Sequence, residues 1–133
     1  MRNLLGLMNQ MYAAVVREHA IHPKNRGELR TANARGSSHF YECGDYFELA
    51  LRLEGETIAE ANFLAKACGP VVALGSIGTE LVRGKTVDQA LELTAFQLDE
   101  AMGGLPPAKR HAILLFLDSL HQALIQYQEQ KRR

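Results

Sequence analysis

The chain has 133 residues, 47% of them hydrophobic, which suits a single domain over residues 1–133 with one core. Its 15 basic and 15 acidic residues give a formal net charge of zero, so no excess of one sign indicates nucleic acid or an anionic membrane as a partner. We see neither an apolar run long enough to span a bilayer nor a secretory leader, and therefore expect a cytoplasmic protein.

The N-terminal stretch has apolar residues at helical spacing. They predict an amphipathic helix from about Leu4 to His19. Pro23 and Gly27 then end the helix and begin an irregular segment.

Two runs of alternating polar and apolar residues follow. They cover Tyr46–Glu54 and Ala59–Lys66, and the short turn Gly55-Glu56 joins them. Alternation with a period of two is typical of half-buried strands, so the pair predicts an antiparallel hairpin. A weaker strand is expected between Thr31 and Tyr41.

After Cys68 the apolar spacing changes to that of a helix. A helix is predicted from Pro70 to Leu81, because proline is tolerated at the first helical position, and Gly84 is a suitable stop. Gly75 and Gly78 lie beside the apolar stripe, which indicates that another element approaches this helix closely.

Three further helices are expected. The first two begin at capping boxes, and the last runs from about Pro107 to Gln130 after the break at Gly103-Gly104. The capping boxes pair Thr86 with Gln89 and Thr94 with Gln97. The order of elements predicts an α+β fold, in which a small three-stranded antiparallel sheet carries helices on one face.

Four residues could together hold a metal ion or a cluster: Cys43, Asp45, Cys68 and His111. Cys43 precedes the first strand of the hairpin and Cys68 follows the second, so the topology brings the two thiols to the same end of the sheet. Thiolate, imidazole and carboxylate are all zinc ligands, and thiolates favour iron–sulfur clusters.

Other roles for these residues stay open. A buried cysteine is commonly a small hydrophobe, and Asp45 after a glycine suits a turn. A thiol enzyme with Cys68 as nucleophile and His111 as base is a further alternative, although nothing in the sequence marks an oxyanion hole. The remaining histidines have no comparable pairing and are expected to be structural or solvated; they are His19, His22, His39 and His121.

Several motifs, in order along the chain, carry a family likeness. They are His22–Leu29, Cys43-Gly44-Asp45, Ala67-Cys68-Gly69, Val82–Thr86 and Leu105–Lys109. Through them the chain resembles the NifU/IscU-type iron–sulfur cluster assembly scaffolds, which are not enzymes. The resemblance implies an IscU/NifU-like fold over nearly the whole chain.

The resemblance also implies a function, cofactors and partners. Family members accept sulfur from a cysteine desulfurase, assemble a transient [2Fe–2S] cluster and release it to apo iron–sulfur proteins, and some bind zinc at the same ligands. For this chain the expected cofactor is a transient [2Fe–2S] cluster, or else zinc or iron. By resemblance the ligands here are Cys43, Asp45, Cys68 and His111. The segment that a dedicated heat-shock-type chaperone reads in some members corresponds to Leu105, Pro106, Pro107 and Lys109.

The chain departs from the family pattern at one position. The family has a third cysteine directly after the histidine, where this chain has Ala112 after His111. Alanine offers no ligand atom and cannot carry a persulfide. The alternative function is therefore a divergent member that serves as a metal-binding or docking module for a cysteine desulfurase or a chaperone.

Overall fold

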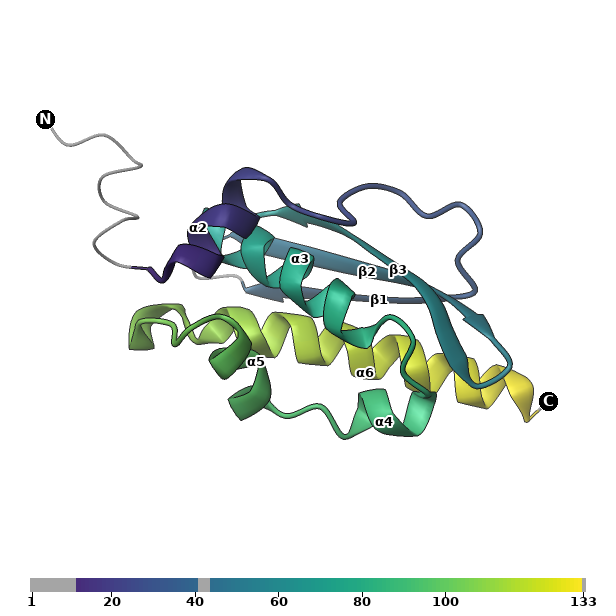
Figure 1. Cartoon of the computed structure of the whole chain (residues 1–133). Helices are drawn as coiled ribbons and strands as arrows, with labels where there is room; N and C mark the ends of the chain where they lie inside the picture. The colour runs from purple at the N-terminus through teal and green to yellow at the C-terminus, as the bar shows by residue number, and fades with distance from the viewer. Residues whose placement is uncertain (1–11, 41–43, 133) are drawn as a thin grey trace, which may run out of the picture.

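The structure, a computed structural model, describes residues 12–40 and 44–132 (Figure 1). Strands β1, β2 and β3 form one antiparallel sheet in that order, and the predicted α+β fold with a three-stranded antiparallel sheet is confirmed. The elements are α2 (Ala14–Ile21), β1 (Ala34–Phe40), β2 (Asp45–Glu54), β3 (Thr57–Lys66), α3 (Gly69–Val82), α4 (Val87–Leu91), α5 (Ala95–Ala101), a 3-10 turn (Pro107–Lys109) and α6 (His111–Lys131).

Helices α3 and α6 cover the same face of the sheet. On that face Phe47 of β2 stacks on Phe63 of β3, with ring centroids 5.7 Å apart, and meets Phe116 of α6 edge-on at 5.8 Å. Helix α3 lies over the same Phe63, because a Cβ on Gly75 would stand 2.5 Å from its ring. The sheet thus carries these helices on one face, as the sequence predicts, and Figure 1 shows them side by side.

The weakly predicted strand is present as β1, and its composition follows from how it packs. A Cβ on Gly36 would lie 1.9 Å from the backbone carbonyl oxygen of Ser119 in α6, so only glycine fits there. Next to it, the hydroxyls of Ser38 and Ser119 share a buried hydrogen bond of 3.0 Å. Small residues are needed on β1 because α6 lies directly against it.

The first predicted helix is partly wrong. Its residues 4–11 lie outside the described part of the chain. Ala13 is extended, with ψ 157°, so the described helix begins only at Ala14 and continues to Ile21. The backbone turns there because Tyr12 enters the core while Ala13 packs on Gly103.

The irregular segment after α2 protects the outer edge of β3. The Phe63 N–H donates to the carbonyl of Asn25, and the Gly27 N–H donates to the carbonyl of Phe63, both at 2.9 Å. Asn25 has a positive φ of 63°, a conformation that asparagine tolerates better than most residues. An exposed strand edge invites pairing with other chains, and this segment occupies it.

The helices after the sheet follow the predicted boundaries closely. Both capping boxes form, and they start α4 and α5. The last helix begins four residues later than predicted, at His111, because Pro107–Lys109 is a 3-10 turn. Its predicted apolar stripe is buried throughout: Ile113, Leu117, Leu120, Leu124 and Tyr127. Among the described residues, no helix has the length and apolarity needed to cross a membrane.

Candidate metal centre

Strand register brings the candidate ligands to one end of the sheet. Asp45 is the first residue of β2, and its neighbour Tyr46 pairs with Lys66, the last residue of β3. Cys68 follows two residues later as the N-cap of α3. The hairpin topology therefore places Cys68 at the same end of the sheet as Asp45.

His111 reaches the same end from α6. Its Nε2 lies 3.3 Å from Oδ2 of Asp45. Asp45 is only 6% exposed and His111 is half-buried, so this contact is largely shielded from water. A carboxylate that holds an imidazole fixes the orientation of the ring, as a metal ligand requires. The structure thus joins two predicted ligands that are 66 residues apart in sequence.

Cys68 combines a free thiol with partial burial. The thiol residue packs against the hydrophobic core and remains half-buried. Its backbone carbonyl accepts the N–H groups of Val71 and Val72 at 3.1 and 3.2 Å, which fixes it at the start of α3. The N-terminal end of a helix attracts negative charge, such as that of a thiolate.

Tyr12 is a buried residue whose electrostatic interaction with Cys68 sequence reasoning missed. Burial raises the pKa of its phenol above the ordinary value of 10.0, while the charge of Lys109 lowers that pKa and the charge of Cys68 raises it further. The helical spacing that includes Tyr12 indicates a core position, but no sequence signal connects it with Cys68.

The complete ligand set stays a prediction. Cys43 lies outside the described residues, and within the described ranges no three Cys, His, Asp or Glu side chains form a group spaced for a metal ion. Ala112, which stands where the family has its third cysteine, is fully buried in the core. The geometry therefore establishes the pair of Asp45 and His111, with Cys68 at the same end of the sheet.

The predicted partner segment lies directly before α6 and differs in exposure along its length. Leu105 belongs to the core, and its N–H donates to Oδ1 of Asp99 at 2.9 Å. Pro107 is exposed, whereas Pro106 and Lys109 are half-buried. A partner that reads this segment would meet the prolines and Lys109 rather than the leucine.

An apolar groove adjoins the centre on its α5 side. It has a volume of about 620 Å³, and His111 is part of its wall. Two large apolar side chains on the wall face solvent: Phe96 is 70% exposed and Leu114 is 58% exposed. The groove extends the candidate centre into a surface that a protein partner could contact.

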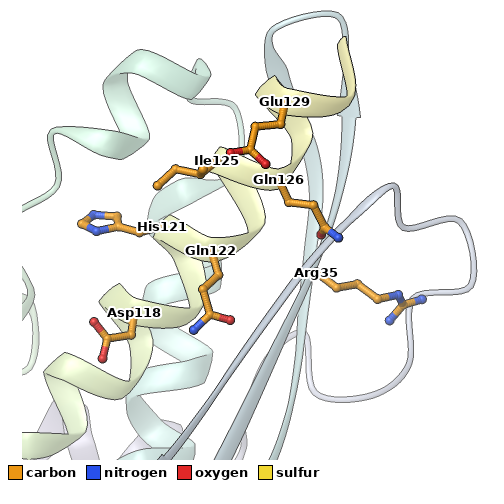
Figure 2. Close-up of a pocket in the computed structure, with 7 residues that line it drawn as sticks. All are labelled: Arg35, Asp118, His121, Gln122, Ile125, Gln126 and Glu129. Atoms are coloured by element: carbon orange, nitrogen blue, oxygen red, sulfur yellow. The ribbon is translucent and has the colours of Figure 1, made fainter. Parts of the chain in front are cut away.

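A second groove, of about 540 Å³, lies further along α6 against Arg35 of β1 (Figure 2). Its first residue on α6 is Asp118, seven residues beyond His111, which is about 10 Å along a helix. His121 lies in its wall with a buried Nε2 that has no hydrogen-bond partner among the described residues. Figure 2 shows the polar side chains spread along the helix rather than converging, so this groove is separate from the candidate centre.

Comparison with known protein families gives one consistent result. The family described as NifU-like N terminal domain matches residues 11–133. A relative from Aquifex aeolicus, named iron-sulfur cluster assembly scaffold protein IscU, is 37% identical over 122 residues, which cover 90% of this chain and 78% of that protein. The scaffold protein IscU 1 of Archaeoglobus fulgidus is 32% identical over 117 residues, which cover 88% of this chain and 76% of the relative.

Solved structures with the same fold were also found. A NifU-like N-terminal domain from Brucella abortus superposes with a TM-score of 0.73 at 20% identity, covering 92% of this chain and 98% of that one. An iron–sulfur cluster assembly scaffold protein from Fervidobacterium islandicum gives a TM-score of 0.72 at 20% identity, covering 87% and 98%. At this identity the likeness supports the fold.

Proposed function

Because the chain belongs to the NifU-like N terminal domain family, we propose that it is a scaffold or carrier on which an iron–sulfur cluster is assembled and from which the cluster is transferred. The observation that carries the proposal is the contact between Asp45 and His111 at the end of the sheet where Cys68 caps α3. The relatives named as scaffolds support the same role.

The proposed ligands for the cluster are Cys43, Asp45, Cys68 and His111. Two thiolates, one imidazole and one carboxylate can complete a tetrahedral iron or zinc site, or hold a [2Fe–2S] cluster less tightly than four thiolates would. A thiol from a partner protein or from glutathione could supply the ligand that Ala112 lacks. Weak retention suits a protein that has to give its cluster away.

The proposed role is not enzymatic. A cysteine desulfurase would supply sulfur, and apo iron–sulfur proteins would receive the finished cluster. A heat-shock-type chaperone that reads Pro106, Pro107 and Lys109 would assist release. This exchange requires reduced thiols and therefore fits a reducing cytoplasm.

Anaerobic reconstitution with ferric iron and sulfide tests the proposal. Visible absorbance and metal analysis should show cluster on the wild-type protein and none on a Cys43→Ala/Cys68→Ala double variant. As a matched control, Asp118→Ala/His121→Ala removes two ligand-type side chains from the other groove and should keep wild-type binding. The proposal is wrong if both double variants bind as much metal as the wild type.

A second candidate is a docking module without cluster chemistry. Ala112 and the exposed apolar residues Phe96 and Leu114 beside His111 favour it. Purified protein would then bind a cysteine desulfurase in a pull-down but take up no iron or zinc. Metal uptake through the proposed ligands would exclude this candidate.

A further inference from the structure

The two most exposed large apolar side chains among the described residues lie in one groove. Phe96 is 70% exposed and Leu114 is 58% exposed, and both line the groove of about 620 Å³ between α5 and the start of α6. An exposed apolar patch on a soluble domain is typically a contact surface. The rest of the wall consists of Ala95, Asp99, Arg110, His111 and Ile113.

The chain before α2 joins the described structure beside this groove. A Cβ on Gly103 would lie 2.6 Å from the Cβ of Ala13, so Ala13 packs directly on the end of α5. The N–H of Gly104 donates to the carbonyl of Asp99 at 2.9 Å, and Asp99 belongs to the wall of the groove. Ala13 therefore lies about one helical turn beyond the groove. Figure 1 shows α2 and the N-terminal end of α6 at the same end of the molecule.

The direction of the chain at Ala13 also matters. Its backbone is extended, with ψ 157°, so the chain leaves the axis of α2 at this residue. What precedes it is consequently not aligned with α2 and can turn toward α5 and α6. Residues 4–11 would span about 12 Å as a helix, which is enough to cross a groove that begins one turn away.

Residues 1–11, which lie outside the described part of the chain, carry an apolar stripe at helical spacing. Its members are Leu4, Leu7, Met8 and Met11, at positions i, i+3, i+4 and i+7. This is the spacing with which an amphipathic helix places its side chains in a hydrophobic groove. The chain therefore holds an apolar groove and a matching apolar stripe on either side of Ala13.

We propose that residues 4–11 bind in the groove of the same chain and cover Phe96 and Leu114. The short connection through Ala13 gives the segment an effective concentration in the millimolar range, which favours it over a free partner of similar chemistry. Because His111 is part of the wall, the bound segment adjoins the candidate metal centre. A protein that docks on this groove has to displace the segment first. The contact needs no metal, so the proposal is independent of the proposed cluster role.

Fluorescence quenching tests whether the groove is covered. The chain has no tryptophan, so Phe96→Trp places a single indole in the groove, and acrylamide quenching of the whole metal-free chain measures its exposure. In this background Leu7→Asp/Met8→Asp should raise the quenching constant about threefold, because carboxylates are costly to bury in an apolar groove. As a matched control, Asn9→Asp/Gln10→Asp adds the same charge beside the stripe and should keep the parent constant.

A second variant changes the groove instead of the segment. Leu114→Asp alters a side chain that is 58% exposed, so the fold should persist, and the quenching constant should again rise about threefold. Ile125→Asp is its control, because Ile125 is 49% exposed on the same helix but lines the other groove. Circular dichroism checks that all four variants keep the helical content of the parent.

Two results would overturn the proposal. The first is a quenching constant that stays at the parent value in both Leu7→Asp/Met8→Asp and Leu114→Asp, because the indole would then be exposed already. The second is protection that is lost on dilution of the parent protein, since a contact within one chain does not depend on protein concentration. Dilution dependence would mean that a second copy covers the groove.

Discussion

Different interactions stabilise two regions of the molecule. One is the interface between the sheet and its helices, and the other is the end of the sheet near Asp45. At the interface, backbone and rings touch with no spare room: a Cβ at Gly36 would meet the Ser119 carbonyl at 1.9 Å, and one at Gly78 would meet the Phe116 ring at 2.4 Å. Such packing admits one arrangement of the elements.

The candidate metal centre is built from polar and half-buried groups instead. Asp45 and His111 are in contact at 3.3 Å, and Cys68 is fixed through its backbone while its thiol is half-buried. Polar contacts of this kind can be exchanged for contacts with a ligand. The comparison teaches that a rigid frame presents polar groups that are able to change partners, as the proposed carrier role requires.

The largest effect is expected at the interface. In Gly36→Ala the methyl group would overlap the Ser119 carbonyl, so β1 and α6 would have to separate. We expect a loss of about 3 kcal/mol in the free energy of unfolding, measured from urea denaturation midpoints. Ser37→Ala, the neighbouring change on β1, should lose less than about 1 kcal/mol. Equal stability of Gly36→Ala and the wild type would show that the interface is more adaptable than its packing indicates.

A change in the candidate centre should alter binding far more than stability. In His111→Gln the amide can still donate to Asp45, but the imidazole ligand is gone. We expect iron affinity to fall about tenfold or more, while the free energy of unfolding changes by less than about 1 kcal/mol. Anaerobic iron titration and urea denaturation measure the two quantities.

His121→Gln is the control for that experiment. It removes a histidine from the same helix, in the other groove, and should leave the iron affinity unchanged. If both variants lose iron affinity to the same extent, the cause is a general disturbance of α6 and not the removal of an iron ligand.

Restoring a thiol after His111 should have a smaller effect. Ala112 is fully buried, so the added sulfur in Ala112→Cys must be accommodated at a cost of about 1 kcal/mol in unfolding free energy. In return the cluster gains a third thiolate, and we expect it to be retained several times longer when a chelator is added.

Ala123→Cys provides the matched comparison. Ala123 is equally buried and lies three turns further along the same side of α6. It should show a similar loss of stability without longer retention. Longer retention in both variants would mean that any extra thiol protects the cluster.

The sequence predicts the fold in most of its parts because local signals agree with tertiary packing. Alternation located β2 and β3, and capping boxes located α4 and α5. The start of α2 could not be found in this way, because the break at Ala13 depends on contact with Gly103, which is distant in sequence. A single sequence shows the periodicity of its residues, but it does not show which residues distant in sequence will come into contact.

Less of the candidate site than of the fold could be predicted from the sequence. Hairpin topology is enough to place Cys68 and Asp45 at the same end of the sheet, and the family motifs drew attention to His111. The electrostatic interaction of Tyr12 with Cys68 was not predictable, because it depends on how α2 packs on α3. Buried hydrogen bonds of Ser76 help to set that arrangement. A serine within an apolar helix does not show, from the sequence alone, which distant residue it will bond.

The smallest effect is expected at Tyr12, a buried residue just before α2. Burial raises the pKa of this phenol above 10.0, so the folded state holds the proton more tightly than the unfolded state does. Its contribution to stability is therefore complete below pH 10 and is lost as the pH rises through the higher folded-state pKa. Tyr12→Phe has no proton to lose, so its urea midpoint should fall less than that of the wild type between neutral pH and pH above 10. We expect a difference below about 1 kcal/mol, and parallel pH profiles would show that the phenol is not held in the core.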